Sequence, residues 1–97
     1  MLMSAYWMAH VNVTDANEYG EYAKLAGPAI EKYGGKFLAR GGRAVTFEGE
    51  EFARNVVIQF DSVEQAAAAY NSPEYKEALE HSANSSIRNV CVVEGIE

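Results

Sequence analysis

Two side chains in this sequence have the types and positions to do chemistry, an arginine and a histidine. Arg40 comes directly before Gly41 and Gly42, where a bend can re-aim a side chain toward a cleft. There its guanidinium would clamp a carboxylate or an enolate-like oxygen, or would instead pair with one of the fourteen acidic residues. His10 lies in an apolar stretch and would titrate near neutrality, as a general base does, or would be a hydrogen-bonded interior or interface histidine. We therefore predict Arg40 and His10 as catalytic candidates.

A second group of candidates is mostly aromatic. Tyr22 falls on the apolar face of an expected helix, and Tyr70 and Tyr75 flank an expected helix break. Tyrosines around one cavity would suit a planar aromatic or phenolic ligand, whereas tyrosines in a core pack their rings and hydrogen-bond once. Asn71, at the same break, would bind a ligand or its own backbone. We predict these four residues as ligand-binding candidates.

Other chemistries have little support in the sequence. Cys91 lies between two valines without a neighbouring base and is expected to be a small buried apolar residue. His81 is expected at the surface, and the spacing of His10, His81 and Glu48 does not favour a metal site. The chain has no nucleophile elbow, phosphate loop or dinucleotide fingerprint. We therefore expect neither a metal nor a cofactor.

The elements that must position these side chains are separated by turn and capping residues. Runs rich in β-branched and aromatic residues predict strands, and a glycine pair is expected to interrupt the second of them as a bulge or bend. The strand segments are 5–13, 36–40 with 44–48, 54–60 and 87–93.

Capping residues predict the helices. Asp15 with Glu18 predicts a helix start, and apolar residues then recur at spacings of three and four. Pro28 lies inside this pattern and is expected to kink or split the helix. Ser62 and Ser72 predict the starts of a helix pair before the last strand.

The order strand, helix, strand, strand, helix pair, strand predicts a ferredoxin-like βαββαβ α+β sandwich with a four-stranded antiparallel sheet. Both faces of the strands are apolar: Trp7 and Ala9 oppose Tyr6 and Met8. Helices can cover only one face. We therefore predict a homodimer that packs through the open sheet face, and the alternative is a solvent face that tolerates exposed apolar side chains.

Composition limits the classes of function. The 97 residues suffice for one domain, spanning 1–97. One cysteine excludes an internal disulfide framework, and no apolar run approaches the ~20 residues of a membrane span. A net charge of −6 disfavours nucleic acid as a partner. We expect a soluble, cytoplasmic protein without a membrane or nucleic-acid partner.

Two segments resemble a known family. Residues 33–42 read Tyr-Gly-Gly-Lys-Phe-Leu-Ala-Arg-Gly-Gly, and residues 71–75 read Asn-Ser-Pro-Glu-Tyr. With these segments the chain resembles the uncharacterised bacterial family called domain of unknown function 1330. The resemblance implies a dimeric α+β barrel with a pocket between sheet and helices. Relatives by fold include cofactor-free monooxygenases, haem-degrading enzymes and lactone isomerases.

Three functions are open from the sequence. The first is a small-molecule-binding homodimer, such as a cofactor-independent oxygenase or isomerase on a small aromatic or lactone-like compound. In this first function, Arg40 would bind the anionic oxygen of the ligand and His10 would move the proton. Tyr22 and Tyr75 would shape the pocket. The second is a non-enzymatic dimeric metabolite-binding or protein-interaction module. The third is a fold whose cavity is filled and purely structural.

Overall fold

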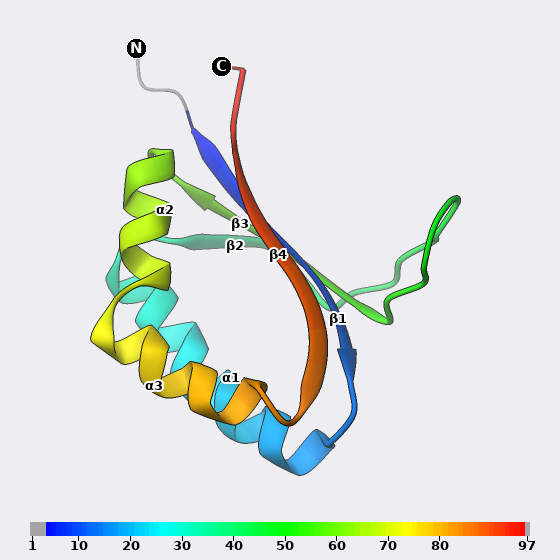
Figure 1. Cartoon of the computed structure of the whole chain (residues 1–97). Coiled ribbons are helices and arrows are strands. Elements are labelled where there is room, and N and C mark those ends of the chain that lie inside the picture. Colours follow the sequence, from blue (N-terminus) through cyan, green and yellow to red (C-terminus); the bar gives the residue numbers. More distant parts are fainter. Residues whose placement is uncertain (1–3, 97) are drawn as a thin grey trace.

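The computed structural model describes residues 4–96. The chain folds into a four-stranded antiparallel sheet with helices on one face (Figure 1). The strand order is β2-β3-β1-β4, which confirms the ferredoxin-like sandwich. The element bounds are β1 Ala5–Val13, α1 Ala16–Lys32, β2 Lys36–Arg40, β3 Arg54–Phe60, α2 Val63–Tyr70, α3 Pro73–Ser82 and β4 Ser86–Glu94.

Alternation along β1 divides the sheet into two faces. Trp7, Ala9 and Val11 are buried beneath the helices, whereas Met8 is partly exposed and His10 is exposed. The neighbouring strands follow the same alternation, because directly paired residues in antiparallel strands share a face. The inner face therefore belongs to the core of one chain, and the outer face has no helix over it (Figure 1).

The helix starts are those that the capping residues predict. The side chains of Asp15, Ser62 and Ser72 accept hydrogen bonds from backbone N–H groups in the first turns of α1, α2 and α3. The expected split at Pro28 is wrong, because α1 runs from Ala16 to Lys32 with this proline inside it. Pro28 lies on the exposed side of α1, where water can hydrogen-bond the carbonyl that the proline leaves free, while the opposite side is held by packing.

The second strand is shorter than expected. It ends at Arg40, and the segment 44–48 lies in an exposed loop that spans residues 41–53. Gly41 turns the chain at this point with φ +69°, a conformation that glycine adopts easily. The loop extends away from the sheet (Figure 1) and leaves Phe47 90% exposed.

An aromatic cluster joins the helices to the sheet. The ring of Trp7 lies 5.2 Å from that of Tyr75 on α3 and 6.1 Å from that of Phe60 on β3. All three residues are at most 2% exposed. Burial of such rings supplies a large part of the hydrophobic free energy of a small domain.

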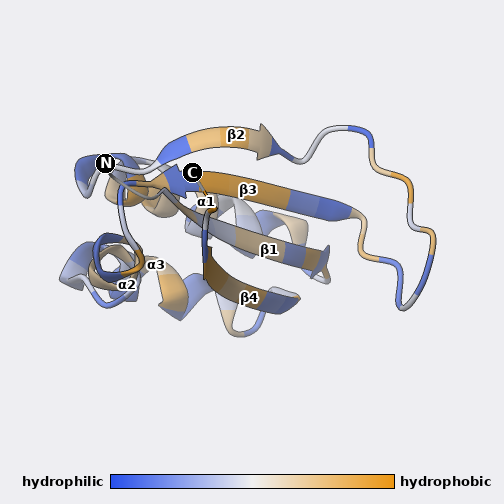
Figure 2. Ribbon diagram, turned by 90° about the horizontal axis from the view of Figure 1, so that it is seen from above, coloured by the Kyte–Doolittle hydropathy of each residue, from blue (hydrophilic) through white to orange (hydrophobic). Residues whose placement is uncertain are grey.

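The outer face of the sheet mixes apolar side chains with polar ones, since His10 pairs with Asn55 and Asn89 there. Figure 2 shows that the hydrophobic colouring of β3 and β4 continues along much of each strand. Ile87 and Val93 on β4 are 60% and 49% exposed, and partly exposed Met8 and Val57 lie opposite each other between β1 and β3. Within residues 4–96, no helix has the length and apolar character needed to cross a lipid bilayer.

Candidate functional site

A cavity of about 50 Å³ lies between α1 and the inner face of the sheet. Its apolar wall comes from β1, β3 and α1, and its polar wall from three arginines and two tyrosines. The residues whose side chains give it its character are Trp7, Tyr19, Tyr22, Phe37, Arg40, Arg54 and Arg88. The cavity is therefore cationic and aromatic.

Strand pairing brings two of the arginines together. Arg54 at the start of β3 and Arg88 on β4 both lie directly opposite Val11 of β1. Paired residues share a face, so both arginines rise from one row across the inner face. Because β3 and β4 flank β1, their backbones are two strand spacings, or about 10 Å, apart. Arg40, at the end of β2, pairs with Val56 and so projects to the same face.

Arg54 is partly buried and hydrogen-bonds the Tyr19 hydroxyl, but one of its nitrogen atoms lacks a partner. Its guanidinium lies 5.9 Å from the centre of the Tyr19 ring, and a side chain at Gly41 would collide with its Nη1 atom. Its Nε atom is buried without a hydrogen-bond partner. Buried polar atoms in native proteins are nearly always satisfied, so this N–H group is a candidate ligand contact.

Arg88 is connected to two buried tyrosines. Its Nη2 donates a 3.0 Å hydrogen bond to the Tyr75 hydroxyl, which lies 2.7 Å from the Tyr22 hydroxyl. The guanidinium carbon also lies 4.9 Å from the centre of the Tyr22 ring. Burial raises the pKa of Tyr75 well above its ordinary value of 10.0, so its hydroxyl keeps its hydrogen at physiological pH.

Arg40 stands at the exposed rim of the cavity. Its guanidinium carbon lies 3.5 Å from the centre of the Phe37 ring, a stacking arrangement that holds the planar group. A methyl group at Gly27 on α1 would come within 3.0 Å of its Nη2 atom. The small size of Gly27 therefore leaves room for this arginine beside the helix.

The arginines are not neutralised by carboxylates. The ion pairs among residues 4–96 are Lys24–Glu21, Lys32–Glu74 and His81–Glu18, and none includes a cavity arginine. Burial also raises the pKa of Tyr19, so that hydroxyl stays neutral. A chain with a net charge of −6 thus keeps a local concentration of unpaired positive charge in one cavity.

The candidates chosen from the sequence reach this region unequally. Arg40 and Tyr22 line the cavity. Tyr75 is fully buried behind it and reaches it through the Tyr22 hydroxyl. Tyr70 instead borders an open groove between α3 and β4, and Asn71 caps α2 by donating to the carbonyl of Ala67.

His10 is not brought together with Arg40. It is exposed on the outer face, where its Nδ1 atom lies 2.6 Å from Asn55 Oδ1 and its ring 5.8 Å from that of Phe52. The reason is strand alternation, since His10 has the same parity as Met8 and the opposite parity to Trp7. Within one chain, His10 and Arg40 therefore lie on opposite faces of the sheet and do not share the cavity.

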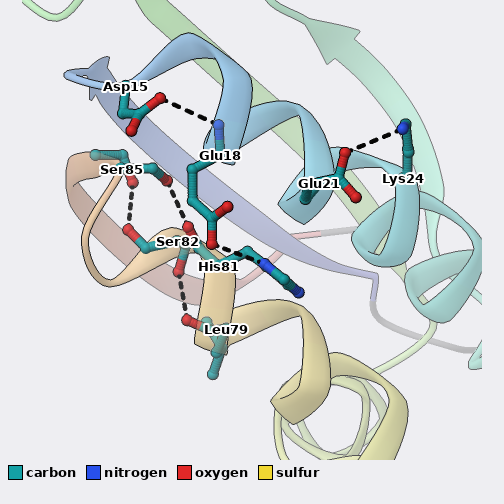
Figure 3. Close-up of polar contacts among 9 residues, drawn as sticks. Asp15, Glu18, Glu21, Lys24, Leu79, His81, Ser82 and Ser85 are labelled. Carbon is teal, nitrogen blue, oxygen red and sulfur yellow. Dashed lines mark hydrogen bonds and ion pairs between the residues drawn. The ribbon is translucent and has the colours of Figure 1, made fainter.

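The remaining titratable candidates also lie apart from the cavity. His81 contacts Glu18 of α1 at 2.8 Å (Figure 3), and Glu48 lies in the exposed loop. Cys91 is exposed on the outer face rather than buried, because it alternates with the inward-facing Val90 and Val92. Residues 4–96 contain no cluster of three or more histidine, cysteine, aspartate or glutamate side chains that could hold a metal ion.

Arg54 and Arg88 were missed as sequence candidates, although the signal is present. Each is separated by two from a residue of the expected inner face, Val56 and Val90 respectively. Charged residues that alternate with core valines must either reach solvent or line a cavity. Parity within the strands therefore identifies both arginines as inward-facing.

Comparison with solved structures supports the fold. A protein of unknown function from Rhodopseudomonas palustris superposes with a TM-score of 0.81 at 18% identity, covering 100% of this chain and 85% of that one. A protein of unknown function from Bacteroides fragilis, described as dimeric and ferredoxin-like, gives 0.64 at 12% identity, covering 94% and 95%. SnoaB, a cofactor-independent oxygenase from Streptomyces nogalater, gives 0.67 at 10% identity, covering 98% and 95%.

Sequence comparison gives the family. No curated protein matches the chain. One family profile matches residues 4–96. The match includes segment 33–42, which contains β2, and segment 71–75, where α3 begins. The chain belongs to the family described as Domain of unknown function (DUF1330).

Proposed function

We propose that this protein is a homodimer in which each subunit binds a small organic anion in the cavity beneath α1. The observation that carries the proposal is the convergence of Arg40, Arg54 and Arg88, without carboxylate partners among residues 4–96, on one tyrosine-lined cavity. Charges placed near low-dielectric walls are unfavourable unless they are compensated. An anionic ligand supplies that compensation.

The arginines match the chemistry of an oxygen anion. A guanidinium presents several N–H donors in a planar fork that fits a carboxylate. The Arg40 guanidinium at the rim offers exposed donors. The Nε atom of Arg54 is a buried donor without a protein acceptor, and a ligand oxygen would reach it only after a shift of the Arg54 side chain.

The cavity volume limits what can enter. An engineered cavity that binds benzene measures about 150 Å³, three times the roughly 50 Å³ found here. A carboxylate group or the oxygen-bearing end of a larger compound fits without movement. A whole aromatic ring would require the side chains of the wall to shift.

The dimer part of the proposal rests on the outer face. Partly or fully exposed apolar residues from three strands, Met8, Val57, Cys91 and Val93, form a patch on it beside the polar His10, Asn55 and Asn89. Contiguous apolar surfaces of this kind mark interaction sites. A second copy is the proposed cover, because the Bacteroides fragilis protein of the same fold is described as dimeric, and two such sheets face to face would form the dimeric α+β barrel.

A second candidate function is cofactor-independent oxygenation or isomerisation of an enol or phenol. It is favoured by the resemblance in fold to the cofactor-independent oxygenase SnoaB and by the cationic wall. Positive charge lowers the pKa of a bound enol or phenol and stabilises its anion. In such oxygenation the substrate anion itself reduces dioxygen, so the protein mainly supplies the oxyanion site.

Binding is tested by NMR titration of the protein with acetate and pyruvate. We expect saturable shifts confined to cavity residues, and about tenfold weaker binding in Arg54→Met and in Arg88→Met, since each loses a charged hydrogen bond. The control is Arg43→Met, which removes an exposed loop arginine and should bind like the unmodified protein. Absence of saturable shifts, or equal weakening by the control, would contradict the proposal.

Oxygen uptake separates the second candidate from simple binding. Quinols and enolisable ketones are supplied to the protein in metal-free buffer, and dioxygen consumption is compared with that of Arg54→Met. Turnover that depends on Arg54 favours an enzyme. Saturable binding without turnover of any of them favours the binding module.

A further inference from the structure

The hydrogen-bond chain behind the cavity has a direction that atom counting can establish. Arg88 can only donate, because a guanidinium has no acceptor. The Tyr75 hydroxyl accepts from it at 3.0 Å and lies 2.7 Å from the Tyr22 hydroxyl. Two hydroxyl hydrogens are therefore available, and one of them bridges the two tyrosine oxygens.

The remaining hydrogen belongs to Tyr22. Tyr75 is 0% exposed and has no further hydrogen-bond partner within residues 4–96. If Tyr22 donated to Tyr75, the Tyr75 hydrogen would be buried without an acceptor, which is unfavourable. The favoured arrangement runs from Arg88 to Tyr75 to Tyr22, and it leaves the Tyr22 hydrogen free at a residue that lines the cavity.

We infer that Tyr22 donates its hydroxyl hydrogen to an oxygen of the bound anion and that Tyr75 is a positioning residue which, with Arg88, sets this direction. The inference rests on the proposed anion-binding function and adds specificity to it. Tyr22 contacts the ligand, whereas Tyr75 acts on it through Tyr22.

The direction of the chain leaves the cavity with donors and few free acceptors. The oxygen of Tyr22 already accepts from Tyr75, and the oxygen of Tyr19 is within hydrogen-bonding reach of Arg54. The arginines accept nothing. A ligand whose polar atoms near the carboxylate are all acceptors, such as a 2-oxo acid or an enolate, therefore fits better than a 2-hydroxy acid or an amino acid, whose added hydrogens would be unpaired.

The test compares pyruvate with lactate, which differ by a carbonyl and a hydroxyl on the same carbon skeleton. NMR titrations give both dissociation constants for the unmodified protein, Tyr22→Phe, Tyr75→Phe and Tyr70→Phe. Tyr70 is the matched control, because its ring lies 5.2 Å from that of Tyr75 while its hydroxyl has no hydrogen-bond partner within residues 4–96. Circular dichroism checks that each variant is folded.

We expect pyruvate to bind about tenfold more tightly than lactate, the factor that one buried hydrogen bond supplies. Tyr22→Phe and Tyr75→Phe should both reduce this ratio toward one, and Tyr70→Phe should keep it. A merely structural role for Tyr75 would weaken both ligands equally.

Two failures can be told apart. If pyruvate binds but the ratio is near one, or is unchanged in Tyr22→Phe and Tyr75→Phe, the direction inferred for Tyr22 is wrong while the anion site stands. If neither acid binds the unmodified protein and acetate does not bind either, the anion site itself is wrong and this inference fails with it.

Discussion

The two faces of the sheet use the same strands for different purposes. Beneath the helices, β1 presents Trp7 and Val11, and the strands beside it add Arg54 and Arg88. On the other face β1 presents Met8 between the apolar Val57 and Cys91, and His10 between Asn55 and Asn89, and no helix covers these residues. The inner face is complete within one chain except for its unpaired cations, whereas the outer face lacks a cover. Under the proposal above, a small anion completes the inner face and a second copy of the chain covers the outer face.

The difference follows from a period of two residues. Every inward residue on a strand has an outward neighbour, so a strand with apolar residues in both parities must bury both faces. The helices of residues 4–96 all lie over one face. The proposed site and the proposed interface therefore use the same residue runs, and substitutions one position apart should have different consequences.

The largest effect is expected from Trp7→Ala on the inner face. The indole is 2% exposed and packs against the rings of Phe60, Tyr70 and Tyr75. Removing it should lower the free energy of unfolding by about 3–5 kcal/mol, measured by urea denaturation. Met8→Ala, one residue along, should lower it less and in a manner that depends on protein concentration. If both variants lost the same free energy of unfolding at every protein concentration, the two faces would not differ in the way proposed.

The next effect concerns association. Val57→Asp places a charge in the middle of the outer face, opposite Met8, and should weaken the dimer by at least about tenfold, since an unpaired charge in an apolar interface is strongly disfavoured. The measurement is sedimentation equilibrium. Ala68→Asp adds the same charge on the exposed side of α2 and should leave association unchanged. A Val57→Asp protein that remains dimeric would show that the outer face is not the interface.

Much of the fold could be predicted from the sequence, because its signals are local. Capping by Asp15, Ser62 and Ser72 and the alternation in β1 and β3 act over a few residues, and the structure confirms them. The prediction of a strand over 44–48 is wrong for a non-local reason. The segment alternates like a strand, but the turn at Gly41 directs it away from β3. A strand requires a partner as well as a pattern.

The site was less predictable. The glycines beside Arg40 identify it, helical spacing identifies Tyr22, and the expected helix break identifies Tyr75. The hydrogen bond between Tyr22 and Tyr75 spans 53 residues of sequence, and that from Arg88 to Tyr75 spans 13. Side-chain hydrogen bonds at such separations depend on tertiary packing that local patterns do not encode. The position of His10, by contrast, follows from a local pattern. Alternation along β1 places it on the outer face, whereas Arg40 is on the inner face.

A smaller effect separates site from scaffold within α1. Gly27→Ala and Gly20→Ala should each stabilise the helix by about 0.5–1 kcal/mol, because alanine restricts the unfolded chain. A methyl group at Gly27 lies 3.0 Å from Arg40 Nη2, whereas one at Gly20 meets nothing within 4 Å. We therefore expect acetate affinity to fall severalfold in Gly27→Ala and to stay constant in Gly20→Ala, by NMR titration. Equal affinities would place Arg40 outside the site.

The smallest effect concerns the helices that cover the inner face. Glu74, in the first turn of α3, accepts hydrogen bonds from Lys32 and from the Tyr33 hydroxyl near the end of α1. The Lys32 ammonium, the Glu74 backbone N–H and the Tyr33 hydroxyl together lower the pKa of this carboxyl from 4.5 to about 2. A lowered pKa in the folded state stabilises the fold at pH values above the ordinary one.

Glu74→Gln should therefore be slightly less stable than the unmodified protein at pH 7, and the difference should disappear as the pH falls from about 4.5 to about 2. Because the contacts lie at the surface, salt should also reduce the difference. Thermal unfolding across this pH range measures it, with Glu77→Gln as the control on the exposed side of α3. A difference that persists at pH 2, or one of equal size in the control, would show that the charge of Glu74 does not hold α3 to α1. The packing of α3 on α1 would then depend on the buried side chains of the core and on the contact between His81 and Glu18.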